Sequence, residues 1–130
     1  MTENDVKLLF KSMKNMKAKR EILKCLEKTD AEYDQICKIL YVMENSLDVL
    51  SESEREIIQM HLVEGTTWER VITQYEERHG RQNGYSKRTY ERLQQKALKR
   101  LVEVIGNSEI VSFLRKIHKE ERYDISLSYS

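Results

Sequence analysis

The chain contains no proline and only four glycines in 130 residues, and this shortage of helix-breaking residues constrains its fold more than any other feature. Relative to alanine, proline costs about 3 kcal/mol and glycine about 1 kcal/mol inside a helix. Leu, Lys, Glu, Arg and Gln, which are good helix formers, recur along the whole length. The length suits one compact domain, or one domain with a helical extension. We therefore expect an all-α protein.

Apolar residues at helical spacing predict a first helix from about Asn4 to Lys28, with a weak, polar centre. Thr29 and Asp30 are both suitable N-cap residues, and the pair Thr29 and Glu32 resembles a capping box that opens a second helix. The second helix has an apolar stripe at Tyr33, Ile36, Leu40, Met43, Leu47 and Leu50. This stripe is short for a coiled-coil dimerisation seam, so we favour a helical hairpin that folds on itself or on the next domain.

Residues 1–49 carry nine basic and nine acidic side chains, so their charge is balanced. Their apolar stripe is also unrelated to the basic segment described below. We interpret residues 1–49 as a separable hairpin that serves self-association or docking.

Residues 50–106 carry the pattern of further helices. Ser51 and Glu54 form a second capping-box pattern, which opens a helix expected over residues 52–63. Gly65 follows this helix and is expected to end it in the left-handed conformation. The chain should therefore turn sharply just after residue 63.

The next helix is expected to be capped by Thr66 or Thr67 and to end within residues 78–80. Its apolar face consists of Trp68, Val71, Ile72 and Tyr75. A polar stretch over 79–85 suits a turn, and Ser86 then caps a long helix. The side chains expected to face inward from this long helix are Tyr90, Leu93, Ala97, Leu98, Leu101 and Val104.

The break at 106–108 predicts the end of the long helix and the start of a last one within residues 107–130. The side chains expected to pack from this C-terminal helix are Ile110, Val111, Phe113, Leu114 and Ile117. Residues 124–130 are expected to form a frayed tail.

Positive charge is concentrated in residues 78–100, which carry eight basic side chains and only one acidic one, whereas the whole chain has a net charge of +1. Three helices are joined by short connections, and the last of them begins with an N-cap and basic residues. This arrangement is typical of a helix-turn-helix. Such a unit binds double-stranded DNA because the major groove admits one α-helix. A basic helical face can instead be simply solvated, or can serve a membrane or an acidic protein.

The outward side of the long helix carries side chains that discriminate bases, because Arg pairs with guanine, Gln with adenine, and Glu accepts from cytosine. The expected base-reading residues are Lys87, Arg88, Glu91, Arg92 and Gln95. The expected phosphate-binding residues are Arg78, Arg81, Ser86, Thr89, Lys96, Lys99 and Arg100. For Arg78 and Arg81, a plain solvated loop is an equal alternative.

The segment Ser86-Lys-Arg-Thr-Tyr-Glu-Arg-Leu-Gln-Gln-Lys-Ala-Leu-Lys-Arg-Leu101 resembles the Ser-x-x-Thr-(apolar)-x-Arg-(apolar)-x-x-(basic)-Ala-Leu-x-x-Leu signature of region 4 in bacterial sigma factors. The upstream segment from Leu50 to Ile72 resembles the leading helices of the same domain, so the resemblance covers about 50–104. It implies that the basic outward face reads bases and that Tyr90, Leu93 and Leu98 belong to the core.

Two departures limit this resemblance. About eight additional residues, the insert 76–83, separate the two motif helices, and the chain has no counterpart of the sigma region that binds core polymerase and melts promoters. We therefore do not expect a complete sigma factor. The layout, with a helical N-terminal half and a region 4-like C-terminal half, resembles the late-gene transcription regulators of phages and prophages, the ArpU-like group among them.

Other classes of function lack the residues that they need. His61, His79 and His118 are scattered, Cys25 and Cys37 fit no metal-site or disulfide spacing, and no catalytic motif occurs. We expect no enzymatic activity, metal or cofactor. No apolar run is long enough to span a bilayer and the start does not resemble a signal peptide, so we expect a cytoplasmic protein without a membrane partner.

The sequence thus predicts a sequence-specific, double-stranded DNA-binding transcription regulator, acting on phage or prophage genes. Besides duplex DNA, RNA polymerase and a second copy of the chain are candidate partners. Two alternatives stay open at this point. One is a DNA-packaging protein such as a small terminase subunit, and the other is a module that binds RNA polymerase or a sigma factor without reading DNA.

Overall fold

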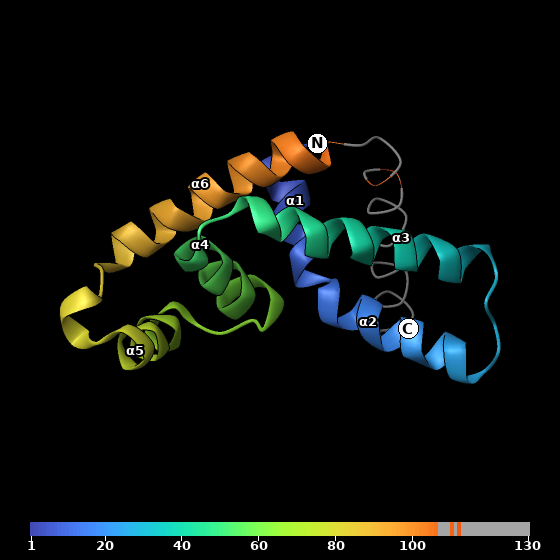
Figure 1. Ribbon diagram of the computed structural model, residues 1–130, viewed down its shortest axis with the longest axis horizontal. Helices are drawn as coiled ribbons and strands as arrows, with labels where there is room; N and C mark the ends of the chain where they lie inside the picture. The colour runs from blue at the N-terminus through green and yellow to red at the C-terminus, as the bar shows by residue number, and fades with distance from the viewer. Residues whose placement is uncertain (107–109, 111, 113–130) are drawn as a thin grey trace, which may run out of the picture.

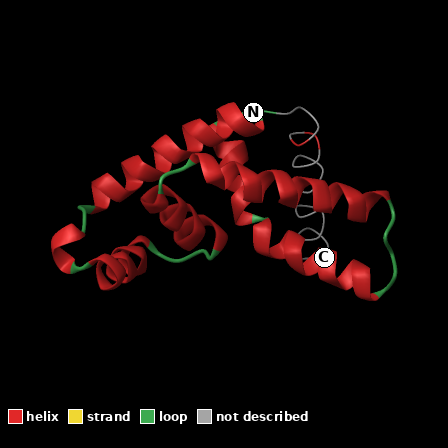
Figure 2. Ribbon diagram, in the orientation of Figure 1, coloured by secondary structure: helices red, strands yellow, loops and turns green. Residues whose placement is uncertain are grey.

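The computed structural model describes residues 1–106 together with 110 and 112, and in this part of the chain every regular element is a helix (Figure 2). The all-α prediction is therefore confirmed. Of the elements below, η1 and η3 are 3-10 turns and η2 is a π-helix. In chain order the elements are α1 (Glu3–Lys11), α2 (Met13–Cys25), α3 (Ala31–Ser46), η1 (Leu47–Val49), α4 (Glu52–Ile57), η2 (Ile58–Val63), α5 (Trp68–His79), η3 (Arg81–Asn83) and α6 (Lys87–Ile105).

The N-terminal segment forms two helices instead of the single helix expected over residues 4–28. The break lies at Ser12, whose hydroxyl donates a hydrogen bond of 2.8 Å to the carbonyl oxygen of Leu8. Such back-bonding from a serine to the preceding turn bends helices. After this bend, α1 packs on α6 whereas α2 packs on α3 (Figure 1). Only α2 and α3 therefore form the predicted hairpin.

The N-cap of α3 is Asp30, whose carboxylate accepts hydrogen bonds from the backbone amides of Glu32 and Tyr33. The prediction of a capping box formed by Thr29 and Glu32 was therefore wrong. The apolar stripe of this helix is covered inside the chain. Its members Ile36, Leu40, Met43 and Leu50 are buried, while Tyr33 and Leu47 are half-buried. This burial favours the interpretation of the stripe as a face that packs within the chain, in preference to a coiled-coil seam.

One hydrophobic core joins the two halves of the chain. It includes Leu9 and Phe10 of α1, Leu40 of α3, Leu62 of η2 and Leu101 of α6, all of them buried. The boundary that the sequence suggests between residues 49 and 50 stays a prediction, but residues 1–49 do not have a core of their own. A smaller cluster, which we call the second cluster, is formed by Ile57, Met60, Val71, Tyr75 and Tyr90, with Trp68, Ile72 and Leu93 packed against it.

The turns between α4 and α5 follow the sequence pattern closely. The capping box of Ser51 and Glu54 is present, and helical structure continues to Val63, although its second half is a π-helix. Gly65 has a φ of +67°, which side chains rarely adopt, and Thr67 is the N-cap of α5. The predicted helix bounds and left-handed turn are therefore confirmed.

Ser86 caps α6 as predicted, and the inward side of α6 matches the expectation at four of six positions. Tyr90, Ala97, Leu98 and Leu101 are buried and Leu93 is half-buried. Val104 was wrongly placed inward, since it is 51% exposed and Ile105 is buried instead. The buried residues Gln94, Leu98, Leu101 and Ile105 have the spacing of one face of a helix with 3.6 residues per turn. Residue 104 lies beside this face and not on it. The C-terminal helix expected after residue 106 lies outside the described residues, except that Ile110 is buried in the main core.

The shared core predicts that both halves of the chain unfold together. Leu9 is fully buried and its neighbour Leu8 is 38% exposed, so Leu9→Ala should cost about 2–5 kcal/mol of unfolding free energy and Leu8→Ala about 0.5 kcal/mol or less. The loss should appear in urea unfolding followed by fluorescence of Trp68, the only tryptophan, which lies in the second cluster. An unchanged Trp68 transition beside a shifted circular-dichroism transition would show that the halves unfold independently.

Candidate nucleic-acid interface

The outward side of α6 presents the five residues that the sequence predicts to read bases. Lys87, Arg88, Glu91, Arg92 and Gln95 are all exposed. Successive residues of a helix are rotated by 100°, so burial of the opposite side directs these side chains to solvent. Among the described residues this face has one ion pair, which is long, with 3.9 Å between Lys87 Nζ and Glu69 Oε1, and both side chains are exposed. The face therefore remains available to a ligand.

The residues predicted to bind phosphate fall into three groups. Arg78, Arg81, Lys96 and Lys99 are exposed and form no ion pair with any described residue. Ser86 and Thr89 lie at the start of α6, where their hydroxyl oxygens are 3.0 Å apart and Ser86 Oγ accepts from the amide of Thr89. Arg100 is the third case.

Arg100 is engaged inside the protein, which the sequence did not predict. Its guanidinium donates a hydrogen bond of 2.9 Å to Oε1 of Glu54, whose side chain is only 4% exposed. The same carboxylate accepts from the amide of Ser51 at the start of α4. Removing one partner of such a pair is costly, because a buried charge is left uncompensated. Arg100 therefore fixes α4 against α6, and this role competes with phosphate binding.

The insert 76–83 is folded against the helices that it connects. Its first part extends α5 to His79, whose ring Nε2 lies 2.9 Å from a carboxylate oxygen of Glu56 in α4. Gly80 then turns the chain with a φ of +87°, and the amide of the Asn83 side chain donates to the carbonyl oxygen of His79 at 2.6 Å. The insert leaves Arg78 in the last turn of α5 and Arg81 in η3 exposed.

Three tyrosines join α5 to the start of α6. The ring centroids of Tyr75, Tyr85 and Tyr90 lie 5.4 to 5.6 Å apart, in tilted and edge-on arrangements. The backbone amide of Tyr85 donates to the hydroxyl oxygen of Tyr90, and the hydroxyl of Tyr75 lies 2.8 Å from that of Ser53. Burial raises the pKa of Tyr75 and of Tyr90 above the ordinary value of a tyrosine. Aromatic pairs of this geometry add about 0.5–1.5 kcal/mol each beyond area burial.

A histidine and a tryptophan stack at the beginning of α5. The rings of His61 and Trp68 are 3.8 Å apart between centroids, and His61 Nδ1 lies 2.9 Å from the carbonyl oxygen of Thr66. Burial lowers the pKa of His61, and the nearby Lys7 and Lys11 lower it further. His61 is half-buried, and Trp68 packs against the second cluster, as the sequence predicted.

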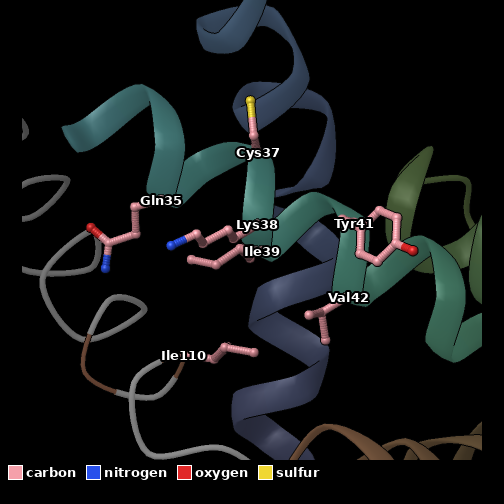
Figure 3. Close-up of a pocket in the computed structure, with 7 residues that line it drawn as sticks. All are labelled: Gln35, Cys37, Lys38, Ile39, Tyr41, Val42 and Ile110. Carbon is pink, nitrogen blue, oxygen red and sulfur yellow. The ribbon is translucent and has the colours of Figure 1, made fainter. Parts of the chain in front are cut away.

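A pocket of about 470 Å³ lies elsewhere, on the outer side of α3 (Figure 3). The residues that line it are Gln35, Cys37, Lys38, Ile39, Tyr41, Val42 and Ile110. Gln35 and Lys38 extend to the same side of α3, whereas Cys37 and Tyr41 are turned away from Lys38 (Figure 3). Within the described ranges no cluster of His, Cys, Asp or Glu could hold a metal ion, and no helix is both long and apolar enough to cross a membrane.

Comparison with family models, with curated proteins and with solved structures gives no match.

The lowered pKa of His61 predicts how stability depends on pH. The folded protein binds a proton on His61 less readily than the unfolded chain does, so this residue should make the protein less stable as the pH falls below about 6.5. His61→Phe keeps a ring that can stack on Trp68 but has no titrating group. Urea titrations give the unfolding free energy of each protein. The wild-type value minus the variant value should be constant at pH 7.5–8.5 and should decrease as the pH falls towards 5. A difference that does not vary with pH would contradict the prediction.

Proposed function

We propose that this protein is a sequence-specific, double-stranded DNA-binding transcription regulator of phage or prophage genes, with α6 as its recognition helix. The observation that carries the proposal is the outward side of α6, which is exposed and carries Arg88, Arg92 and Gln95, none of which forms an ion pair with a described residue. These side-chain types make bidentate contacts with guanine and adenine in the major groove.

The packing of α5 and α6 supports this role. Base contacts need a recognition helix held in one orientation, because a small displacement breaks bidentate hydrogen bonds. The tyrosine cluster holds the start of α6 against α5, and the pair of Arg100 and Glu54 holds its later part against α4. The insert 76–83 joins this arrangement through His79 and Glu56.

The regulatory role and the phage or prophage setting come from the resemblance to region 4 of sigma factors and to the ArpU-like regulators. In this proposal RNA polymerase is a partner and a homodimer is one arrangement of the active protein. The balanced charge of residues 1–49 suits contacts with protein better than contacts with DNA.

Binding to duplex DNA should weaken steeply with salt. Each phosphate contact releases about 0.9 counterion from B-DNA, so about five contacts would give a log-log slope of affinity against salt near −4 to −5. The slope can be measured by fluorescence anisotropy of a labelled duplex between about 50 and 200 mM salt. A flat response would instead favour a module that binds protein.

Substitutions on α6 should separate base reading from phosphate binding. On a site first selected from a random duplex library, Arg88→Ala and Arg92→Ala should each cost about 1–3 kcal/mol and reduce discrimination against random DNA. Lys99→Ala should weaken cognate and random binding alike, because phosphates carry no sequence information directly. Competition titration against both duplexes measures the two effects.

The exposed Arg55 of α4 gives a matched control, since Arg55→Ala removes the same side chain outside α6. Circular dichroism should show that each variant is folded. Equal losses on cognate and random DNA for Arg88→Ala and Arg92→Ala would mean that this face does not read bases.

A further inference from the structure

The connection between the two motif helices is longer than in a typical helix-turn-helix, in which about three or four residues join them. A connection that short leaves little freedom in the angle between the helices. In this chain the insert 76–83 first extends α5 to His79, and residues 80–86 then lead to α6. The longer connection restrains the angle less, so contacts elsewhere in the structure must fix it.

Helix α4 attaches to α5 at two points. Ser53 Oγ lies 2.8 Å from the hydroxyl oxygen of Tyr75. Glu56 lies one turn further along α4, and its two carboxylate oxygens are 3.1 and 2.9 Å from Nε2 of His79. Residues three or four positions apart share one side of a helix, so one side of α4 meets one side of α5. A single attachment would let α5 pivot, whereas two attachments fix the direction of its axis.

The attachment of His79 to Glu56 is charge-assisted and partly shielded from water. A carboxylate only accepts hydrogen bonds, so Nε2 of His79 carries a proton and donates to Glu56. The side chains of His79 and Glu56 are 29% and 14% exposed. Hydrogen bonds to an ionised group are stronger than neutral ones, and burial strengthens them further. This attachment is therefore stronger than a pair on the open surface.

Stacked rings connect this attachment to α6. The ring centroid of His79 lies 4.2 Å from that of Tyr75, which in turn lies 5.4 Å from that of Tyr90 in α6. Tyr90 is fully buried, and it lies in the first turns of α6 among the residues predicted to read bases. Helix α4 also holds the later part of α6 through Glu54 and Arg100. A shift of the end of α5 relative to α4 would therefore displace the start of α6.

We propose that Glu56 and His79 are a positioning pair for base recognition, which sets the angle between α5 and α6 that residues 80–86 leave free. This proposal rests on the proposed function, and it assigns no contact with DNA to either residue. Bidentate base contacts need narrow ranges of distance and angle, whereas phosphate contacts carry no sequence information directly. The pair therefore controls discrimination between DNA sequences more than affinity for random DNA.

The variant His79→Ala tests this proposal in the full-length chain. The ratio of affinity for a selected duplex to affinity for random duplex should fall about tenfold, as expected when one bidentate base contact is lost. Affinity for random DNA should change by less than about twofold. His79→Gln places an amide donor near the position of Nε2, so it should restore the wild-type ratio.

The control for lost stability is Val6→Ala, since Val6 is fully buried in the main core and does not belong to the second cluster. This control should keep the wild-type ratio under conditions in which circular dichroism shows it folded. The double variant Glu56→Ala, His79→Ala should lose no more discrimination than His79→Ala, because the two residues act as one unit. An unchanged ratio in His79→Ala, or an equal loss in Val6→Ala, would overturn the proposal and leave the base-reading role of α6 intact.

A second measurement needs no DNA. Nitroxide labels on Glu77→Cys of α5 and Glu103→Cys of α6, both exposed positions, report the distance between the two helices by double electron–electron resonance. The native Cys25 and Cys37 are replaced by serine in this chain. His79→Ala should broaden the distance distribution, and His79→Gln should keep its wild-type width. Equal widths would overturn this proposal alone, whereas absence of any duplex binding by the wild type would overturn the proposed function as well.

Discussion

Burial of the inner side of α6 is the constraint on which the rest of the structure depends. This one helix contributes Leu98 and Leu101 to the main core and Tyr90 to the second cluster. Fully burying a leucine is worth about 1.5–3 kcal/mol, so rotation of α6 about its axis would be strongly unfavourable. Because the inner side is buried along the whole helix, the basic outer side must face solvent. A face that is presented in one orientation can be complementary to a regular ligand such as duplex DNA.

Polar and aromatic contacts supplement this burial at particular points along α6. The start of the helix is held by Tyr75 and Tyr85, and its later part by the pair of Glu54 and Arg100. The ion pair places an arginine from the basic segment in a structural role. Not every positive charge of a basic helix is thus available to a ligand. Local sequence does not reveal that Arg100 pairs with Glu54 of α4 while Lys99 stays exposed, because both are basic residues of the same segment.

The N-terminal half takes part in the same architecture. The bend at Ser12 lets α1 turn away from α2 and pack on α6, while α2 and α3 extend as a hairpin (Figure 1). The consequence is that α1 completes the core behind α6. For the α2–α3 hairpin, self-association or docking stays a prediction.

The sequence by itself determined the helical fold class, most helix bounds and the exposed side of α6. Caps such as Ser51, Ser86 and Gly65 act on neighbouring backbone groups, and apolar periodicity needs no knowledge of the partner helix. Only the tertiary structure decided the features that depend on distant residues. It paired Arg100 with Glu54, 46 positions away, buried Ile105 in place of Val104, and packed α1 on α6. These outcomes depend on how helices cross, and crossing geometry follows from the packing of whole surfaces rather than from any local pattern.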